Sequence, residues 1–258
     1  MTEATPTRPA TEPAAQSVGE IVAADYRTAA VFERHGIDFC CGGTAPLAAA
    51  CREKGLDPAA IAAELAAARR GPAERGQDHA AWAPPFLCDY IVNVHHAYLK
   101  ANSGQIAVHA DKTAAVHGAR HPELPRIAAN FAQIAAALAA HLREEEESFF
   151  PAVKRLHAAR QAATPPAAAD RETLQAALPK LRREHDEVGE AIHTIRRLAT
   201  DYALPGDACN TFKVTYELLK EFEADLHKHV HLENNILFPT VARLLEGDSA
   251  APPGHLPE

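Results

Sequence analysis

Long hydrophobic runs are absent from this sequence of 258 residues. Its uninterrupted apolar stretches are far shorter than the ~20 residues that a membrane-spanning helix needs, so we expect no such helix. The first residues, MTEATPTRPATEPAAQ, lack a basic start followed by an apolar stretch, and we expect no secretory signal. Excess positive charge is also missing: the formal net charge is −8, which argues against a general nucleic-acid-binding protein.

Cysteine is scarce, with five residues that lack the spacing of a disulfide framework, so a reducing cytoplasm is the expected location. Two of the five are nevertheless adjacent, Cys40 and Cys41 in the segment GIDFCCGG. Adjacent α-carbons lie ~3.8 Å apart, less than the ~4.4–6.8 Å of ordinary disulfides, so a bond between these thiols would be strained. The pair therefore indicates chemistry rather than a cross-link. The alternative to a chemical role is a structural one, in which the two cysteines are small apolar residues buried at a tight turn.

Composition and breaker residues divide the chain into segments. The first residues are rich in Pro, Thr, Ala and Glu, which is typical of a disordered tail. The stretch GPAERGQDHAAWAPP separates two helical regions and is expected to contain a linker. We predict, in chain order, a disordered tail (1–16), a small helical domain (17–75), a linker (76–85), a four-helix bundle (86–246) and a second tail (247–258).

The small domain carries clear signals for helix starts. An S-x-x-E capping box at Ser17 predicts a helix that runs to about Arg34. A second helix is expected from about Thr44, with Pro46 in its first turn. A third is expected after Asp57, which is a good N-cap residue and is followed by proline.

Four long alanine-rich helices are expected in the second region, separated by the breaks GARHPELP, QAATPPAAAD and YALPGDA. No convincing strand alternation occurs, so the predicted class is all-α, an up-down four-helix bundle preceded by the small helical domain. The predicted helices cover residues 86–118, 123–158, 171–200 and 207–246.

Histidine is abundant, with 15 residues, and two segments of the bundle share a histidine-containing signature, HLREEEESFFP and HVHLENNILFP. His141 and Glu145 are four residues apart in the first, as are His229 and Glu233 in the second, and this spacing places each pair on one helix face. Both pairs continue the apolar stripe of their helix. Because a buried carboxylate is unfavourable unless it is paired or bound to metal, these two intrusions predict a metal site.

The other two predicted helices each place one histidine on their apolar stripe, His96 and His185. The interval from His96 to His141 is 45 residues and that from His185 to His229 is 44. Four histidines and two glutamates can hold two metal ions, each with two imidazoles, and with the carboxylates bridging beside an oxo, hydroxo or water ligand. Iron, zinc or manganese suits such a donor set.

Other histidines in the bundle are expected to have lesser roles. His95 lies about 100° around the helix from its neighbour, so it is expected next to the ligands or at the surface. His117 lies 21 residues after His96, about 31 Å along a continuous helix, too far for one dinuclear site. His227 and His231 are expected to be solvated.

The acidic run Glu144–Glu147 is expected to form a solvated face, except for Glu145, which has the phase of the core. Glu184, next to a predicted ligand, is a candidate hydrogen-bond acceptor beside the centre.

The combination of a DFCCGG helical unit and a bundle ending in HVHLENNILFP resembles the RIC family of iron-sulfur cluster repair di-iron proteins, with a hemerythrin-like bundle. The segments EHDEVG and VNVHHAYL are also similar to family segments. The resemblance implies a cytoplasmic, often dimeric protein with a non-haem di-iron centre, and it makes Cys40 and Cys41 the functional pair. The ligands implied by the resemblance are His96, His141, Glu145, His185, His229 and Glu233.

The function implied by the resemblance is repair of iron-sulfur clusters damaged by nitric oxide or peroxide, through donation of iron to damaged client proteins. Three alternatives remain open at this point. They are a di-iron nitric oxide reductase or peroxide-consuming enzyme, a carrier or sensor of oxygen or nitric oxide, and a bundle with structural zinc. The sequence does not decide whether the protein is an enzyme.

Overall fold

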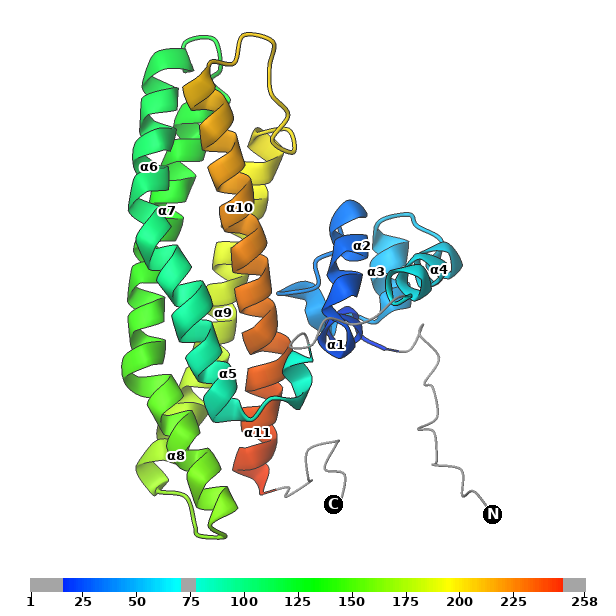
Figure 1. Cartoon of the computed structure of the whole chain (residues 1–258), viewed down its shortest axis with the longest axis vertical. Coiled ribbons are helices and arrows are strands. Elements are labelled where there is room, and N and C mark those ends of the chain that lie inside the picture. The colour runs from blue at the N-terminus through cyan, green and yellow to red at the C-terminus, as the bar shows by residue number, and fades with distance from the viewer. Residues whose placement is uncertain (1–15, 71–77, 248–258) are drawn as a thin grey trace. The chain divides into compact units, whose positions relative to one another are not determined.

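A computed structural model describes residues 16–70 and 78–247, so most of the two predicted tails and part of the predicted linker lie outside the described residues. The described part is helical and contains no strand, only an isolated bridge between Ser17 and Pro46, which confirms the all-α class. None of its helices is long and apolar enough to cross a membrane. The chain separates into two compact units, Met1–Ala80 and Ala81–Glu258 (Figure 1).

The described part of the first unit contains four short α-helices, and its first helix is shorter than predicted. The capping box at Ser17 is present, since its side chain accepts from the backbone N–H of Glu20 and the Glu20 carboxylate accepts in return. The predicted helix to Arg34 is wrong, because Asp25 adopts an extended conformation and caps a new turn by accepting from the N–H of Arg27. The helices are α1 (Val18–Ala24), α2 (Ala29–Arg34), α3 (Leu47–Glu53) and α4 (Pro58–Ala68).

Two turns frame the cysteine segment of this unit. α2 ends at Arg34, and Gly36, two residues later, turns the chain with a φ of +62° that is readily accessible to glycine. The next helix, α3, begins at Leu47 and not near Thr44, because Pro46 and the residue before it are held in an extended conformation. Asp57 caps α4 as predicted, accepting from the N–H of Ala59 at 2.9 Å.

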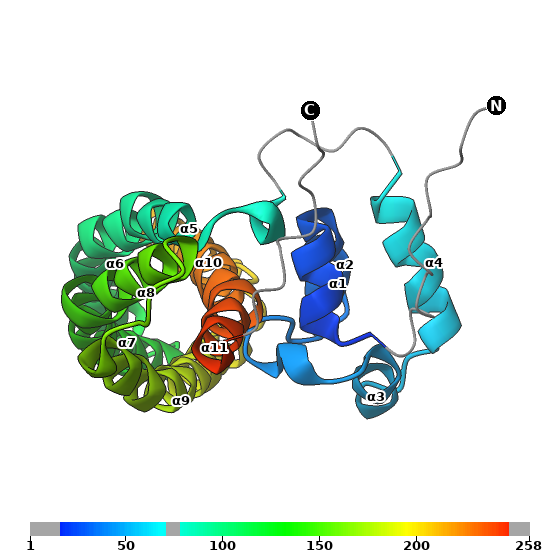
Figure 2. The same cartoon turned by 90° about the horizontal axis from the view of Figure 1, so that it is seen from below.

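The second unit is an up-down bundle of four helical runs, and a view along its axis shows α6, α7, α9 and α10 around a common interior (Figure 2). The predicted helices are confirmed, with ends shifted by at most three residues. Three runs contain a π-helical turn. The elements are α5 (Pro84–Tyr90), a π turn (Ile91–His96) and α6 (Ala97–His117); α7 (Glu123–Glu144), a π turn (Glu145–Phe149) and α8 (Phe150–Gln161); α9 (Ala168–Leu198); and α10 (Asn210–Leu232), a π turn (Glu233–Leu237) and α11 (Phe238–Glu246).

Two of the π turns have the same cause in the sequence. Pro151 and Pro239 each stand two residues after the end of the turn, and a proline lacks the N–H of a regular helix and clashes with the carbonyl four residues earlier. The N–H of Phe150 bonds the carbonyl of Glu145, five residues back, and the N–H of Phe238 bonds that of Glu233. The repeated Phe-Pro element thus produces the same bulge beside both glutamates.

Aromatic rings enclose the polar part of the bundle interior. On one side, the rings of Phe131 and Phe222 meet edge to face, with centroids 5.0 Å apart. On the other, Phe150 stacks on His96 at 5.6 Å and Phe238 stacks on His185 at 5.6 Å. All four phenylalanines are buried, so the polar groups between them lie in an apolar surrounding.

Candidate metal centre

The structure brings the six predicted metal-site residues together inside the bundle. The histidines come one from each helical run, and the glutamates are the first residues of their π turns. Each of the six side chains is 5% exposed or less. The six residues are His96, His141, Glu145, His185, His229 and Glu233.

The histidines pair between the two sequence repeats, not within them. The Nε2 atoms of His96 and His229 lie 3.2 Å apart, and those of His141 and His185 lie 3.0 Å apart. The π turn before α6 thus supplies a pair with α10, and α7 supplies a pair with α9. Each pair therefore combines one histidine from each half of the bundle sequence.

Both glutamates belong to both histidine pairs. The Glu145 carboxylate lies 3.4 Å from Nε2 of His96 and 3.3 Å from Nε2 of His141. The Glu233 carboxylate lies 3.2 Å from Nε2 of His185 and 3.1 Å from Nε2 of His229. Two groups of four side chains, with the two carboxylates in common, can therefore each surround a metal ion.

The carboxylates are buried, ionised and poorly satisfied by the protein. None of the four oxygens of Glu145 and Glu233 has a hydrogen-bond partner among the described residues. Burial opposes ionisation of Glu233, but the imidazoles of His229 and His185 outweigh it and hold the pKa of this carboxyl well below its usual range. The pKa of the Glu145 carboxyl is also lowered, chiefly by His141 against the effects of burial and of Glu233. Two ionised carboxylates with unpaired oxygens in an apolar interior fit the binding of cations.

Three outer residues orient the ring nitrogens that face away from the centre. Nδ1 of His96 contacts Glu146 at 2.8 Å, and Nδ1 of His141 contacts Glu184 at 2.8 Å. Nδ1 of His185 contacts the side-chain oxygen of Asn234 at 2.9 Å. Such partners fix the orientation of metal-binding imidazoles.

These contacts confirm one expectation about the outer residues and correct another. Glu184 is an acceptor beside the centre as predicted, although its partner is His141 and not the adjacent His185. Glu146 was expected on a solvated face. It is only part-exposed and links His96 to Lys100, which donates to it at 2.6 Å. Asn234 was missed, and its position directly after Glu233, matching that of Glu146 after Glu145, is the signal that would have found it.

The remaining histidines of the bundle differ in how well they were predicted. His95 is buried next to the centre, with Nδ1 2.9 Å from Asp225, so its surface alternative is wrong. His231, expected to be solvated, is 1% exposed, and His227 is only slightly exposed. His117 lies at the end of an unbroken α6, where its Nε2 contacts Sγ of Cys209 at 3.0 Å. The prediction that His117 is not part of the six-residue cluster is confirmed.

In the first unit, Cys40 and Cys41 share one aspartate. Oδ1 of Asp38 accepts from the N–H of Cys40 at 2.9 Å and from that of Cys41 at 3.0 Å, and it lies 3.2 Å from Sγ of Cys40. The two sulfur atoms are 3.9 Å apart and form no disulfide. These three side chains form a further group that could hold a metal ion, and Asp38 was missed in the sequence.

The surroundings of the two thiols correct the expectation of little steric cover. Cys40 is 3% exposed, whereas Cys41 is part-exposed. Contact with Cys41 and burial raise the pKa of the Cys40 thiol well above its usual range, so Cys40 is a neutral thiol at pH 7. Cys41 is therefore the member of the pair that a reaction partner can reach.

Two known families match separate parts of the chain. Residues 14–69 match ScdA_N, a domain of unknown function (DUF542), and residues 89–241 match the hemerythrin HHE cation binding domain. The iron-sulfur cluster repair protein YtfE of Yersinia pestis (strain Pestoides F) is 32% identical over 229 residues, which cover 88% of this chain and 97% of that protein. The YtfE protein of Yersinia pseudotuberculosis serotype O:1b (strain IP 31758) gives the same identity and coverage. The chain belongs to the YtfE family.

Membership in the YtfE family confirms the resemblance seen in the sequence and the hemerythrin-like class of the bundle. It also agrees with a cation-binding role for the histidine and glutamate cluster.

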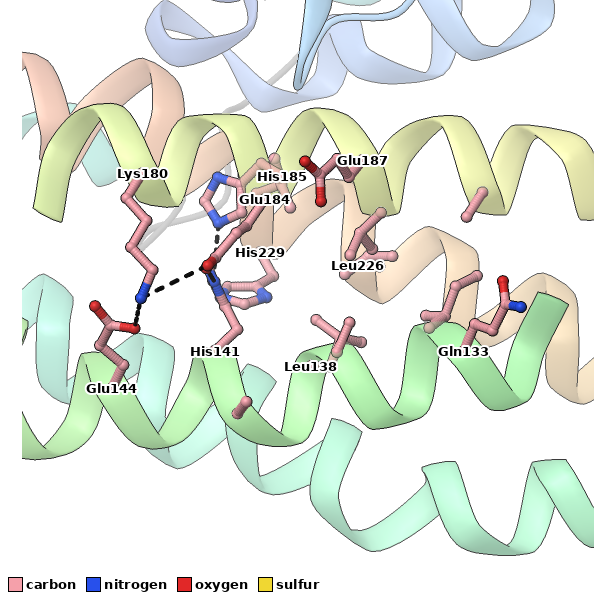
Figure 3. Close-up of a pocket in the computed structure, with 16 residues that line it drawn as sticks. Gln133, Leu138, His141, Glu144, Lys180, Glu184, His185, Glu187, Leu226 and His229 are labelled. Carbon is pink, nitrogen blue, oxygen red and sulfur yellow. Dashed lines mark hydrogen bonds and ion pairs between the residues drawn. The ribbon is translucent and has the colours of Figure 1, made fainter.

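In this YtfE-family bundle, a cavity of about 430 Å³ between α7, α9 and α10 reaches the centre (Figure 3). His141, His185 and His229 are among its lining residues. Lys180 stands at its edge, paired with Glu144 and 3.7 Å from Glu184. The cavity offers a route by which small molecules approach the His141–His185 side of the centre.

Proposed function

We propose that this protein repairs iron-sulfur clusters damaged by nitrosative or oxidative stress, and that it does so by supplying iron. The observation that carries the proposal is the pair of buried carboxylates, Glu145 and Glu233, each shared between two histidine pairs and lacking protein hydrogen bonds. A centre that holds two cations through common ligands suits storage of a metal that is later delivered. The YtfE relatives are named iron-sulfur cluster repair proteins, which supports the same role here.

The proposed metal is iron, as two non-haem ions bridged by the two carboxylates and an oxo or hydroxo group. Four imidazoles and two carboxylates form a nitrogen and oxygen donor set that suits iron. His96 and His229 would hold one ion, and His141 and His185 the other. Bound iron would supply redox chemistry at the centre, while the iron that is delivered is the cargo.

The proposed division of labour gives the bundle (86–246) the store and the small domain (17–75) the transfer step. Cys40 and Cys41 would receive or pass on iron, or act as redox partners. A part-exposed thiol next to the Asp38 carboxylate supports this role, since thiolate and carboxylate oxygen both bind iron.

Metal analysis of the anaerobically purified protein tests the proposed centre. We expect about two iron ions per chain, and a strong loss in Glu145→Leu, which removes a shared ligand. Glu147→Leu is the matched control, because Glu147 lies in the same acidic run but is exposed. One zinc ion and no iron, or equal losses in the two variants, would overturn the centre.

Transfer to a damaged client tests the function. Iron-loaded protein is mixed with a dehydratase whose cluster was destroyed by nitric oxide, with an iron chelator as competitor. We expect recovery of dehydratase activity, a strong decrease in Cys41→Ser, and unchanged iron content in that variant. Recovery that equals the effect of free ferrous iron would refute delivery by the protein.

Binding or reduction of nitric oxide is a second candidate function, and the cavity beside His141 and His185 favours it. Consumption of nitric oxide with an electron donor, unaffected by Cys41→Ser, would support it over delivery. The proposal also includes the homodimer that the resemblance implies, and light scattering of the purified protein tests it.

A further inference from the structure

The internal repeat lets the two histidine pairs of the centre be compared position by position. His96 is equivalent to His185 in the repeat, and His141 is equivalent to His229. The residues that follow and precede the ligands are equivalent as well. Glu146 corresponds to Asn234, since each follows the shared glutamate, and Glu184 corresponds to His95, since each precedes a ligand histidine.

One equivalent pair is supported in the same way in both halves. Nδ1 of His96 contacts Glu146 at 2.8 Å, and Nδ1 of His185 contacts Asn234 at 2.9 Å. The acceptor is a carboxylate in one half and an amide oxygen in the other. Both imidazoles are therefore anchored from outside the centre.

The other equivalent pair is not supported equally. Nδ1 of His141 contacts Glu184 at 2.8 Å, but the residue at the corresponding place beside His229 is His95. The rings of His95 and His229 are nearly parallel, at 9° with centroids 6.0 Å apart, and Nδ1 of His95 contacts Asp225 instead. Nδ1 of His229 is buried and has no hydrogen-bond partner among the described residues.

We infer that the metal position formed by His96 and His229 binds its ion more weakly than the position formed by His141 and His185. The inference rests on the proposed function in that it concerns the same two-metal centre. Outer partners of metal-binding histidines fix the ring and increase its basicity, and loss of one typically lowers metal affinity by about 10- to 100-fold. The ion beside His229 is then the first that the centre yields to a competing ligand at equilibrium.

The other difference in outer partners is one of kind, since His96 contacts the Glu146 carboxylate and His185 the Asn234 amide oxygen, and it leaves neither ring without a partner. Both use the same two carboxylates, so the charge of the bridging ligands is common to both. The four histidines are all 5% exposed or less, so burial does not separate the positions either. The missing partner of His229 is the main asymmetry of the centre.

Crystals of the full chain loaded with a limiting amount of Co(II) test the inference directly. Anomalous scattering at the cobalt edge then gives the occupancy of each position. We expect an occupancy at the His141–His185 position at least several times that at the His96–His229 position. Equal occupancy, or a preference for His96–His229, would overturn the inference.

Two variants test the cause, by titration of the metal-stripped protein with Co(II) followed by optical absorption. His95→Gln offers an amide oxygen to Nδ1 of His229 and an amide N–H to Asp225, so the two binding steps should move together by about 10-fold or more. Glu184→Ala removes the acceptor of His141 and should weaken the tighter step by a similar factor. Glu187→Ala is the control, because the Glu187 side chain is 70% exposed and pairs with Arg183.

If the two Co(II)-binding steps differ in affinity and neither His95→Gln nor Glu184→Ala changes that difference, the missing partner of His229 is not its cause. Repulsion between the two bound ions would then explain the difference. Circular dichroism shows whether each variant folds, and the wild-type crystals decide the inference even if one does not. The cobalt measurements need no iron transfer. A failure of cluster repair would therefore leave the inference intact, and equal cobalt affinities would leave the repair function intact.

Discussion

Two glutamates of the last helical run, Glu223 in α10 and Glu233 at the start of the π turn that follows it, are both fully buried, yet the protein treats them differently. Glu223 accepts from Nε of Arg196 at 2.7 Å and from the hydroxyl of Tyr202 at 2.8 Å. The oxygens of Glu233 lie near imidazole nitrogens but accept no hydrogen bond from the described residues. Burial of a carboxylate is therefore not the sign of a metal ligand. The sign is a buried carboxylate that the protein leaves for a cation to satisfy.

The partners of the two glutamates also differ in their chemistry. Arg196 stays charged at every accessible pH, so it needs its carboxylate permanently. Histidine can release its proton and bind a metal through the same nitrogen, so the partners of Glu233 can exchange a proton for a cation. The first arrangement stabilises the fold, and the second is suited to reversible loading.

The largest difference between the two glutamates is expected in metal binding. Glu233→Leu removes a ligand common to both positions and should lower the metal content from about two ions per chain to less than one. Glu223→Leu should leave the metal content unchanged, because Glu223 is not among the residues that surround the two metal positions and pairs with Arg196 and Tyr202 instead. Metal analysis after anaerobic loading measures both, and comparable losses would show that burial alone decides metal content.

In the metal-stripped protein, Glu223→Leu should lower the stability more than Glu233→Leu, the reverse of their order in metal content. Glu223→Leu removes the buried partner of Arg196, which keeps its contact with the exposed Asp201 at 3.4 Å, and should lower the free energy of unfolding by about 2–4 kcal/mol. The lower part of this range applies if water reaches Arg196, whose side chain is 37% exposed. Glu233→Leu should change it by about 1 kcal/mol or less, because the histidines can become neutral. Urea unfolding measures both, and a larger loss in Glu233→Leu would contradict the contrast.

A smaller effect is expected when only one bond to Glu223 is removed. Tyr202→Phe deletes the hydroxyl that donates to Glu223 and keeps the ring, so the free energy of unfolding should fall by about 1–2 kcal/mol. Burial and the neighbouring Glu223 raise the pKa of Tyr202 above its usual range, so the hydroxyl remains a donor throughout the pH range of the measurement. An unchanged urea midpoint would show that Arg196 alone satisfies Glu223.

The smallest expected effect concerns His117, at the end of α6 away from His96. His96 faces carboxylates, whereas His117 faces the thiol of Cys209, which is exposed at the start of α10. The backbone N–H of Phe212 and the His117 imidazole favour the thiolate and lower the pKa of Cys209 to about 7. The rate of alkylation by iodoacetamide at this residue, followed by mass spectrometry, should therefore rise with pH through a midpoint near 7. His117→Phe should move the midpoint upward, and a wild-type midpoint near 9 would contradict this account.

Much of the bundle and its centre was predictable, because helix periodicity is a local property of the sequence. The spacing between His141 and Glu145 fixed their common face, and the apolar residues before them showed that this face points inward. The pairing of His96 with His229 was not predictable in the same way. It depends on how four helices are rotated about their axes, and this is decided by packing between residues far apart in the chain.

Local exceptions to regular helix geometry explain some of the remaining errors. The π turn Ile91–His96 shifts the phase of the residues in it, so His95, placed by the regular 100° step, is buried and not at the surface. His231 lies in the regular helix α10, two residues after His229, and its burial has no signal in the helical spacing. The predicted helix from Ser17 to Arg34 failed because Asp25 prefers to cap a new turn. The cover over Cys40 arises from the folding of its whole unit, and the glycine-rich turn alone does not reveal it.

The π turns at Glu145 and Glu233 also affect how the centre would be copied or compared. Each turn contains one residue more than a regular helical turn, so each ligand-bearing run is one residue longer than a straight helix of equal span. Deleting Ser148 or Asn235 would restore regular spacing and rotate the chain beyond it by about 100° relative to the ligands. An alignment with an unbulged bundle would show this as a single-residue gap beside the glutamate. If the six ligands were transferred to a bundle of straight helices, one residue would have to be inserted after each of the two glutamates. Without these insertions, the aromatic residues beyond the glutamates would not keep their places.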